Sequence, residues 1–186
     1  MAAGGIPGNV RVGPGRIYVA AIGTAEPVSA SAVLPSAWFA VGYTEEGSLF
    51  STSTTSEPLD VAEELDPIRY ENTSRESSIT FSMAEVTRRN LFLALNQGAG
   101  GANDATIIQP PNLGAEVRTM IVVDSDETPS ATNVRWIFRR GYQSGTIELA
   151  RRKSPQKSLV AVTFRLELPT GQTAWAIYPN SSGLIA

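Results

Sequence analysis

Carboxylates are the main side chains in this sequence that could do chemistry, because it contains no histidine and no cysteine. The absence of histidine and cysteine excludes a Ser-His-Asp triad, a thiolate nucleophile, metal sites built on Cys or His, and disulfides. Two pairs of adjacent carboxylates remain, Glu45-Glu46 and Glu63-Glu64. Neighbours on a strand point to opposite faces, whereas a glycosidase needs two carboxyl groups that face each other across the substrate. These pairs therefore indicate surface charge rather than an active site.

A third acidic segment, Asp124-Ser125-Asp126-Glu127, resembles the first half of a calcium loop. It lacks the glycine that such a loop needs at its sixth position and the bidentate glutamate at its twelfth. A turn that ends at Pro129 is the better interpretation. The sequence contains no P-loop, and Gly98-Ala99-Gly100-Gly101 follows a predicted helix, whereas a dinucleotide-binding loop opens one. We therefore expect no enzyme activity, no cofactor and no metal.

The elements that would position any site are mostly strands. Runs of alternating or continuous apolar residues predict strands at 17–22, 38–41, 78–83, 117–123, 134–139, 146–149, 159–168 and 173–178. Many strands with one packed helix favour a β-sandwich or barrel over an α/β fold. The sequence therefore predicts a mainly β fold of about seven to eight strands with one flanking α-helix.

The one predicted helix covers residues 88–97. Thr87 can cap its first turn, since a threonine hydroxyl accepts a hydrogen bond from a free backbone N–H there. Gly98 suits the left-handed conformation in which many helices end. The side chains that we expect to pack on the sheet are Leu91, Phe92 and Leu95.

The length of 186 residues suits one domain, which we place at residues 16–178. Glycines and prolines predict a flexible N-terminal arm over 1–15, and 179–186 is expected to be a C-terminal tail. The segment 42–77 is long and polar, so we expect a loop between strands there. No apolar run approaches the roughly 18 residues of a membrane span, and the N-terminus lacks a secretory signal pattern. We therefore expect a protein made in the cytoplasm that contacts no membrane.

Charge is distributed unevenly along the sequence, although the net charge is only −3. The acidic block, residues 38–67, has no Lys or Arg, and its acids are Glu45, Glu46, Glu57, Asp60, Glu63, Glu64 and Asp66. The basic block, residues 135–157, has one acid, Glu148, and the cations Arg135, Arg139, Arg140, Arg151, Arg152, Lys153 and Lys157. Two solvated faces would explain this pattern, and so would complementary surfaces that meet head-to-tail between subunits. In the second interpretation the interface residues are the seven acids together with Arg139, Arg140, Arg151, Arg152 and Lys153.

Three segments resemble, in order and spacing, the major tail protein, or tail tube protein, of long-tailed bacteriophages. They are "GRIYVAAIGTAEP" (15–27), "AWFAVGYTEEGSLFST" (37–52) and "ESSITFSMAEVTRRNLFLALN" (76–96). The family has an early strand of the pattern G-x-x-Y-V-A-P-x-G-T, then a strand and turn of the pattern l-G-y-t-x-x-G. A strand of the pattern s-I-T-F-s-l-x-E then leads into the helix. The resemblance covers the first half of the chain, and the rest fits as a set of strands.

The resemblance implies a structural virion protein that self-assembles into stacked, usually hexameric rings. The rings would form the hollow tail tube through which the genome is delivered. The segment 42–77 would reach the adjacent ring and become ordered there. The partners would be further copies of the chain, the tape measure protein, and the tail tip and tail terminator proteins, while DNA passes without specific binding. The protein would reside in the virion tail, and in the host cytoplasm before assembly.

Two further points follow from this resemblance. The bore of such tubes is acidic or neutral, because cations that neutralise phosphates would hold the DNA. We therefore expect the basic block at subunit or ring interfaces or on the outer wall. The alternative function is another β-sandwich virion component, such as a capsid decoration protein or a tail-completion protein.

Charge reversal tests whether the two blocks meet between subunits. Changing the three basic residues of 151–153 to Glu together should block tube growth through like-charge repulsion, while the subunit still folds. A single exposed pair contributes only about 0–1 kcal/mol, so one substitution should not suffice. Mixing this variant with one that carries Lys at the three acidic residues of 63–66 should restore co-assembly in electron micrographs. Growth of the first variant like wild type would show that 151–153 is a solvated face.

Overall fold

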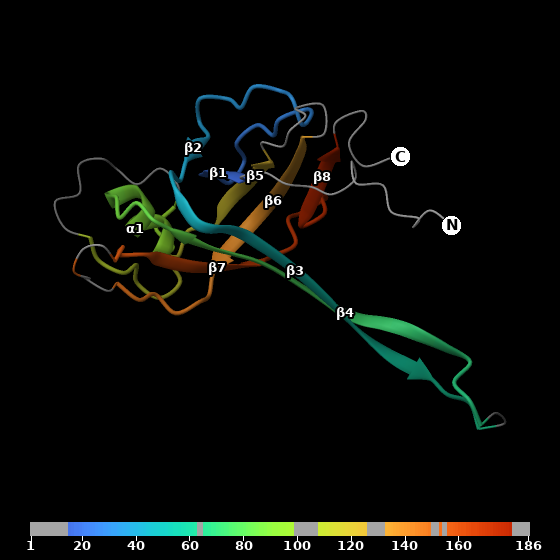
Figure 1. Cartoon of the computed structure of the whole chain (residues 1–186). Coiled ribbons are helices and arrows are strands. Elements are labelled where there is room, and N and C mark those ends of the chain that lie inside the picture. The colour runs from blue at the N-terminus through green and yellow to red at the C-terminus, as the bar shows by residue number, and fades with distance from the viewer. Residues whose placement is uncertain are drawn as a thin grey trace, which may run out of the picture.

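The computed structural model describes residues 15–62, 65–98, 108–125, 133–149, 153 and 156–179. Eight strands and one helix lie within these residues, which confirms the predicted mainly β fold (Figure 1). In chain order they are β1 (Gly15–Ala21), β2 (Phe39–Ala40), β3 (Thr44–Leu59), β4 (Arg69–Met83), α1 (Arg88–Ala94), β5 (Thr119–Ser125), β6 (Val134–Gln143), β7 (Val160–Leu166) and β8 (Trp175–Pro179).

The strands form one antiparallel sheet in the order β2-β1-β5-β6-β7-β4-β3. β7 pairs with β6 only at residues 141–143, and β8 takes up the same edge of β6 at residues 134–138. The sheet does not close into a barrel, because its end strands β2 and β3 are not paired with each other. Two sheet edges are therefore left for contacts with other molecules.

Apolar side chains cover both faces of this sheet. Ile121 and Val123 of β5 belong to the larger core, whereas Met120 and Val122 of the same strand belong to a second cluster on the opposite face. The loop 22–38 covers the second face through Trp38, whose indole N–H donates to the Ala25 carbonyl at 3.0 Å. Burial on both faces explains why β5 reads as a continuous apolar run.

Helix α1 begins as predicted and ends differently. The Asn90 N–H donates to the hydroxyl of the N-cap Thr87 at 3.2 Å. At the other end Asn96, and not Gly98, follows the C-cap in the left-handed conformation, with φ 55°. The N–H of Asn96 donates to Leu93 O at 3.3 Å and that of Gln97 to Phe92 O at 2.8 Å, the bond pattern of a Schellman motif. Asparagine tolerates this conformation, so the helix stops before the glycine.

The helix residues that reach the core differ in part from those expected. Phe92 is buried as predicted, and Leu93 and Ala94 are buried beside it. Leu91 and Leu95 are only partly buried, and Leu91 packs against the edge of the larger core. Three consecutive residues of a helix point in different directions. Burial of Phe92, Leu93 and Ala94 therefore means that the rest of the protein covers this short helix on more than one side.

Two predictions about strands are wrong. Residues 146–149 form no strand, although Ile147 packs on the core, because the chain turns away from β6 at residues 144–145. The predicted loop 42–77 instead contains β3 and the outer part of β4, paired from Thr44–Met83 to Leu59–Arg69. Serine and threonine fill both faces of this ribbon, so it lacks the apolar alternation by which strands are recognised.

The burial of Leu91, Leu93 and Leu95 predicts which Leu→Ala substitution lowers the free energy of unfolding most. Leu93 is 1% exposed, so Leu93→Ala should lower the free energy of unfolding by about 2–5 kcal/mol, the range for a large-to-small change in a packed core. Leu91→Ala and Leu95→Ala should cost less, because both side chains are already partly in contact with water. Urea unfolding of the three variants measures this order. A smaller loss for Leu93→Ala than for Leu95→Ala would contradict the packing described.

Candidate assembly surface

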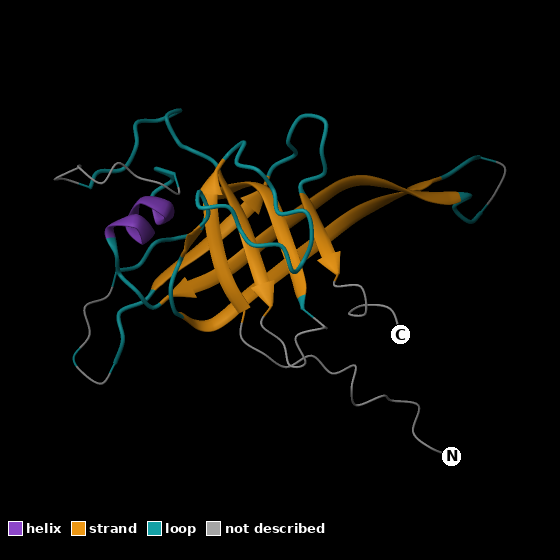
Figure 2. Cartoon of the chain, turned by 90° about the horizontal axis from the view of Figure 1, so that it is seen from above, coloured by secondary structure: helices purple, strands orange, loops and turns teal. Residues whose placement is uncertain are grey.

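The most exposed feature of the part of the chain that the structure describes is an arm, residues 51–62 and 65–77, which contains the outer halves of β3 and β4. The arm projects away from the sheet, on the side opposite to α1 (Figures 1 and 2). Residues 51–59 and 69–76 are exposed on both faces of the ribbon. A two-stranded ribbon without a buried face is marginally stable alone. We therefore take the arm as the first candidate for a surface that another molecule covers.

The backbone of the arm is also unpaired along both outer edges. β7 pairs with β4 only at residues 78–83, so β4 has a free edge over 69–77. β3 is the last strand of the sheet and has a free edge along its length. Free N–H and C=O groups on such edges can pair with a strand from another chain.

The tip of the arm combines apolar and acidic side chains. Its large apolar residues are exposed: Leu59 at 41%, Leu65 at 104%, Ile68 at 57% and Tyr70 at 69%. Its described acids are Glu57, Asp60 and Asp66, which are exposed as well, whereas Glu63 and Glu64 lie outside the described residues. One cation, Arg69, also lies there and pairs with Glu71, so the described tip keeps a net negative charge beside its apolar patch. This combination is typical of a protein contact.

At the inner end of the β3–β4 pair, next to α1 and away from the arm, two distant motifs are in contact. Gly42 has φ +90°, and a Cβ there would lie 2.4 Å from the Glu85 carboxyl carbon. That carboxylate accepts a hydrogen bond from the Tyr43 N–H at 3.0 Å. The Asn90 amide donates to Val41 O at 2.9 Å and to Glu85 O at 2.7 Å. This contact fixes the start of β3 beside α1.

Phe50 is the last side chain of β3 that reaches the core before the arm begins. Its ring lies 5.5 Å from that of Trp136, 5.2 Å from Phe138 and 5.2 Å from Trp175, measured between centroids. Tilted and edge-on ring contacts of this kind stabilise beyond their buried area. Phe50 is not predicted from the sequence as a core residue, because a single aromatic residue in a Ser/Thr-rich run gives no periodic signal.

Several residues of the two charged blocks are paired within the subunit. Lys157 Nζ lies 2.6 Å from Glu45 Oε2, which joins the basic and acidic blocks inside one chain. Arg139 lies 2.7 Å from Glu26, and its side chain is only 11% exposed. Arg140 lies 2.7 Å from Glu167. Arg139 and Arg140 are therefore each paired with an acid of the same chain, and the interface role expected for them stays a prediction.

The remaining predicted interface residues are found on the surface or are not described. Glu46 and Lys153 are exposed, as are the three described acids of the tip. Arg151 and Arg152 lie outside the described residues. Arg135, the remaining arginine of the basic block, is buried and lies 2.7 Å from Asp124, and it donates to Ser29 O and Ala32 O, so it holds the loop 22–38.

Comparison with known proteins assigns the family. A family model described as phage tail tube protein matches residues 7–164. The chain belongs to the phage tail tube protein family. A comparison with curated proteins finds no match. The family is a structural one of the phage virion, which confirms the resemblance noted above and points to a non-enzymatic role in the tail.

Two further observations concern the described part of this tail tube protein. It contains no group of three or more His, Cys, Asp or Glu side chains placed to hold a metal ion. Its described helix is too short and polar to cross a membrane.

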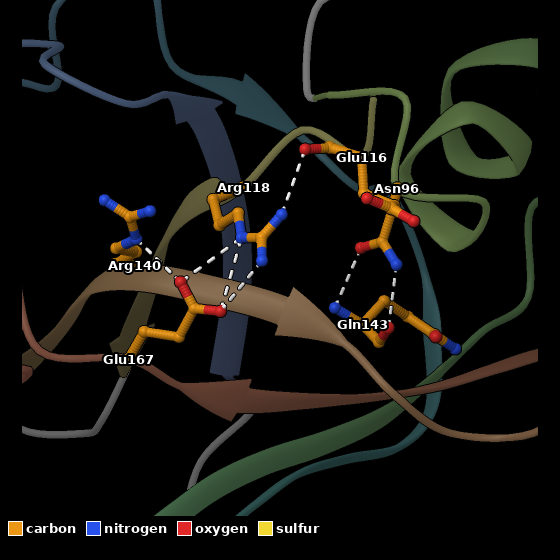
Figure 3. Close-up of polar contacts among 6 residues, drawn as sticks. All are labelled: Asn96, Glu116, Arg118, Arg140, Gln143 and Glu167. Carbon is orange, nitrogen blue, oxygen red and sulfur yellow. Dashed lines mark hydrogen bonds and ion pairs between the residues drawn. The ribbon is translucent and has the colours of Figure 1, made fainter. Parts of the chain in front are cut away.

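The surface near α1 carries a shared carboxylate (Figure 3). Glu167 accepts from Arg118 at 3.2 Å and from Arg140 at 2.7 Å, and the Arg118 guanidinium lies 4.7 Å from the centre of the Tyr142 ring. Nearby, the Asn96 side chain donates to Gln143 O at 2.7 Å and accepts from Gln143 N–H at 2.9 Å. Asn96 thus extends the ladder of β6 and ties the end of α1 to the sheet.

The environment of Glu167 shifts its pKa downward. Partial burial acts to raise that pKa, but the hydrogen bonds donated by Arg118 and Arg140 favour the charged form and outweigh it. The bond to Glu167 is also the main cause of the raised pKa of Arg118, and the bond to Glu26 that of Arg139.

This shift predicts acid sensitivity in the tail tube protein. A carboxyl whose pKa is lower in the folded state stabilises the fold above its unfolded pKa, and this contribution is lost as the pH falls through the folded value. Glu167→Gln should therefore lower Tm at neutral pH, and the difference from wild type should shrink below the ordinary glutamate value of 4.5. Thermal unfolding across pH 3–7 measures it, with the exposed Glu148→Gln as a control. A difference that stays constant with pH would contradict the shift.

Proposed function

We propose that this tail tube protein assembles into stacked hexameric rings and that the phage genome passes through the bore without specific binding. The arm is the observation that carries this proposal. A ring needs contacts between neighbours around the axis, and a tube needs further contacts along it. A compact subunit with an open sheet supplies the first kind, because its free edges can pair with those of neighbouring subunits.

The arm supplies the second kind of contact. Its strand of nine residues, 51–59, extends roughly 30 Å at about 3.3 Å per residue, so it reaches well beyond its own sheet. Its exposed faces and apolar tip favour a role in which it is covered by a subunit of the next ring.

The tube would also have partner proteins, and the subunit would occupy two locations in turn. We infer that the tube contacts the tape measure protein inside it and the tail tip and tail terminator proteins at its ends. The subunit would accumulate in the host cytoplasm and enter the virion tail on assembly. Family membership supports these assignments.

Shortening the arm separates folding from stacking. Replacing residues 54–75 by Asn-Gly would join Ser53 to Glu76, which are partners in the ribbon, through a two-residue hairpin turn. We expect wild-type protein at high concentration to form uniform hollow filaments in electron micrographs. The shortened variant should keep its Tm, because all but one of the described side chains removed are exposed, but it should form no filaments.

A matched control keeps the arm and alters another exposed apolar residue, as in Val33→Ser, and should assemble like wild type. Filaments from the shortened variant would overturn the stacking role of the arm. If the wild type formed no hollow filaments at any concentration, the proposed function itself would fail.

A further inference from the structure

We infer that the tip of the arm docks into a groove at the root of the arm of a second copy of this chain. The inference rests on the proposed function, because it names the surface that receives the arm. The groove has a volume of about 580 Å³. It lies between the arm residues 72–77 and the segment that joins β7 to β8.

The groove offers apolar contact surface. Leu166, Leu168, Ala174 and Trp175 line one side of it. Leu168 is 77% exposed, so it has little contact with its own subunit. An exposed leucine beside a partly buried tryptophan suits an incoming apolar side chain, because contact with it would remove both from water.

The groove also offers backbone partners. β7 pairs with β4 as far as Ser78, and the groove begins where that pairing stops. The free edge of β4 therefore runs along the groove over residues 72–77. An extended segment of another chain lying there could take the place next to β4 that β7 leaves open.

Charge selects the acidic tip as the occupant. Arg75 is the one charged residue among the described residues that line the groove. It makes no ion pair within the described part of the chain. The tip carries Glu57, Asp60 and Asp66, so a tip in the groove would bring several acids to this arginine.

The tip has a matching apolar face. Ile68 comes directly before β4, and Tyr70 is the second residue of that strand and lies opposite Pro58. Ile68 and Tyr70 are 57% and 69% exposed. They would cover the exposed Leu168 and the part of Trp175 that stays accessible, since the Trp175 ring also packs against Phe50.

The geometry requires two copies. The ribbon leads the tip away from its own root, so a subunit cannot fill its own groove (Figure 1). A contact between the tip of one copy and the root of another is heterologous, and its repetition gives an open stack rather than a closed dimer. This is the contact that a tube needs along its axis.

Cross-linking tests the contact directly, because the chain contains no cysteine of its own. Ile68→Cys places a thiol on the tip, and Leu168→Cys places one in the groove. Filaments grown from an equal mixture of the two variants are treated with a short bis-maleimide. We expect covalent dimers, at least tenfold more than in filaments in which Leu113→Cys replaces either partner. Leu113 is fully exposed and lines neither surface, so it serves as the matched control.

The outcomes separate the two proposals. Dimers from the mixture, and a ladder of longer multimers from the variant that carries both cysteines, would support the docking contact. Filaments without such dimers, or dimers formed by Ile68→Cys alone, would overturn it and leave the tube function standing. A failure of wild-type protein to form filaments would instead count against the proposed function.

Charge exchange supplies a second readout. Arg75→Glu should slow filament growth at least tenfold, and combining it with Asp66→Lys in the same chain should recover much of that loss. Both residues lie on the exposed arm, so neither change should alter Tm. Growth of Arg75→Glu at the wild-type rate would show that Arg75 does not face an acidic tip.

Discussion

The contact of Glu85 with Gly42 is the constraint from which the long β3–β4 ribbon starts. Glycine lets the chain take a positive φ and lets a carboxylate approach where any Cβ would collide with it. The same carboxylate holds the next backbone N–H, and Asn90 ties the beginning of the helix to this corner. Phe50 then fixes β3 on the core a few residues further on. The long ribbon is thus anchored at its inner end, whereas its outer part has no buried face.

Two largely buried arginines of β6 hold the loop 22–38 on the sheet. Arg135 and Arg139 fix the loop 22–38 across one face of the sheet, through two carbonyl oxygens and through Glu26. Their side chains are 4% and 11% exposed, so these pairs are screened less than surface pairs are. These two arginines of the basic block are therefore paired within the subunit and stabilise its fold. The acids of the arm tip, by contrast, remain exposed and available to a partner.

In the proposed tube, the open sheet and the arm would supply two different kinds of assembly contact. A sheet with unpaired ends suits neighbours that continue it sideways. The arm, with apolar residues at its tip and an apolar groove at its root, carries both halves of a contact that can repeat without closing. A structural subunit of this kind needs no catalytic site. The properties that would matter for it are the length of the arm, the free edges of the sheet, and the match between the tip of the arm and the groove at its root.

The sequence by itself determined the strands that carry an apolar face, the start of the helix at Thr87, and the family. Alternation and capping are local signals, and the order of motifs is kept along the chain. Tertiary structure alone decided the rest. Residues 51–59 form a strand only because β4 pairs with them, and their serines and threonines give no periodic signal. Arg139 is neutralised by Glu26, whose position beside it depends on how the loop folds over the sheet. The end of the helix is tied to β6 because the Asn96 side chain meets the backbone of Gln143, a contact that no local pattern can show.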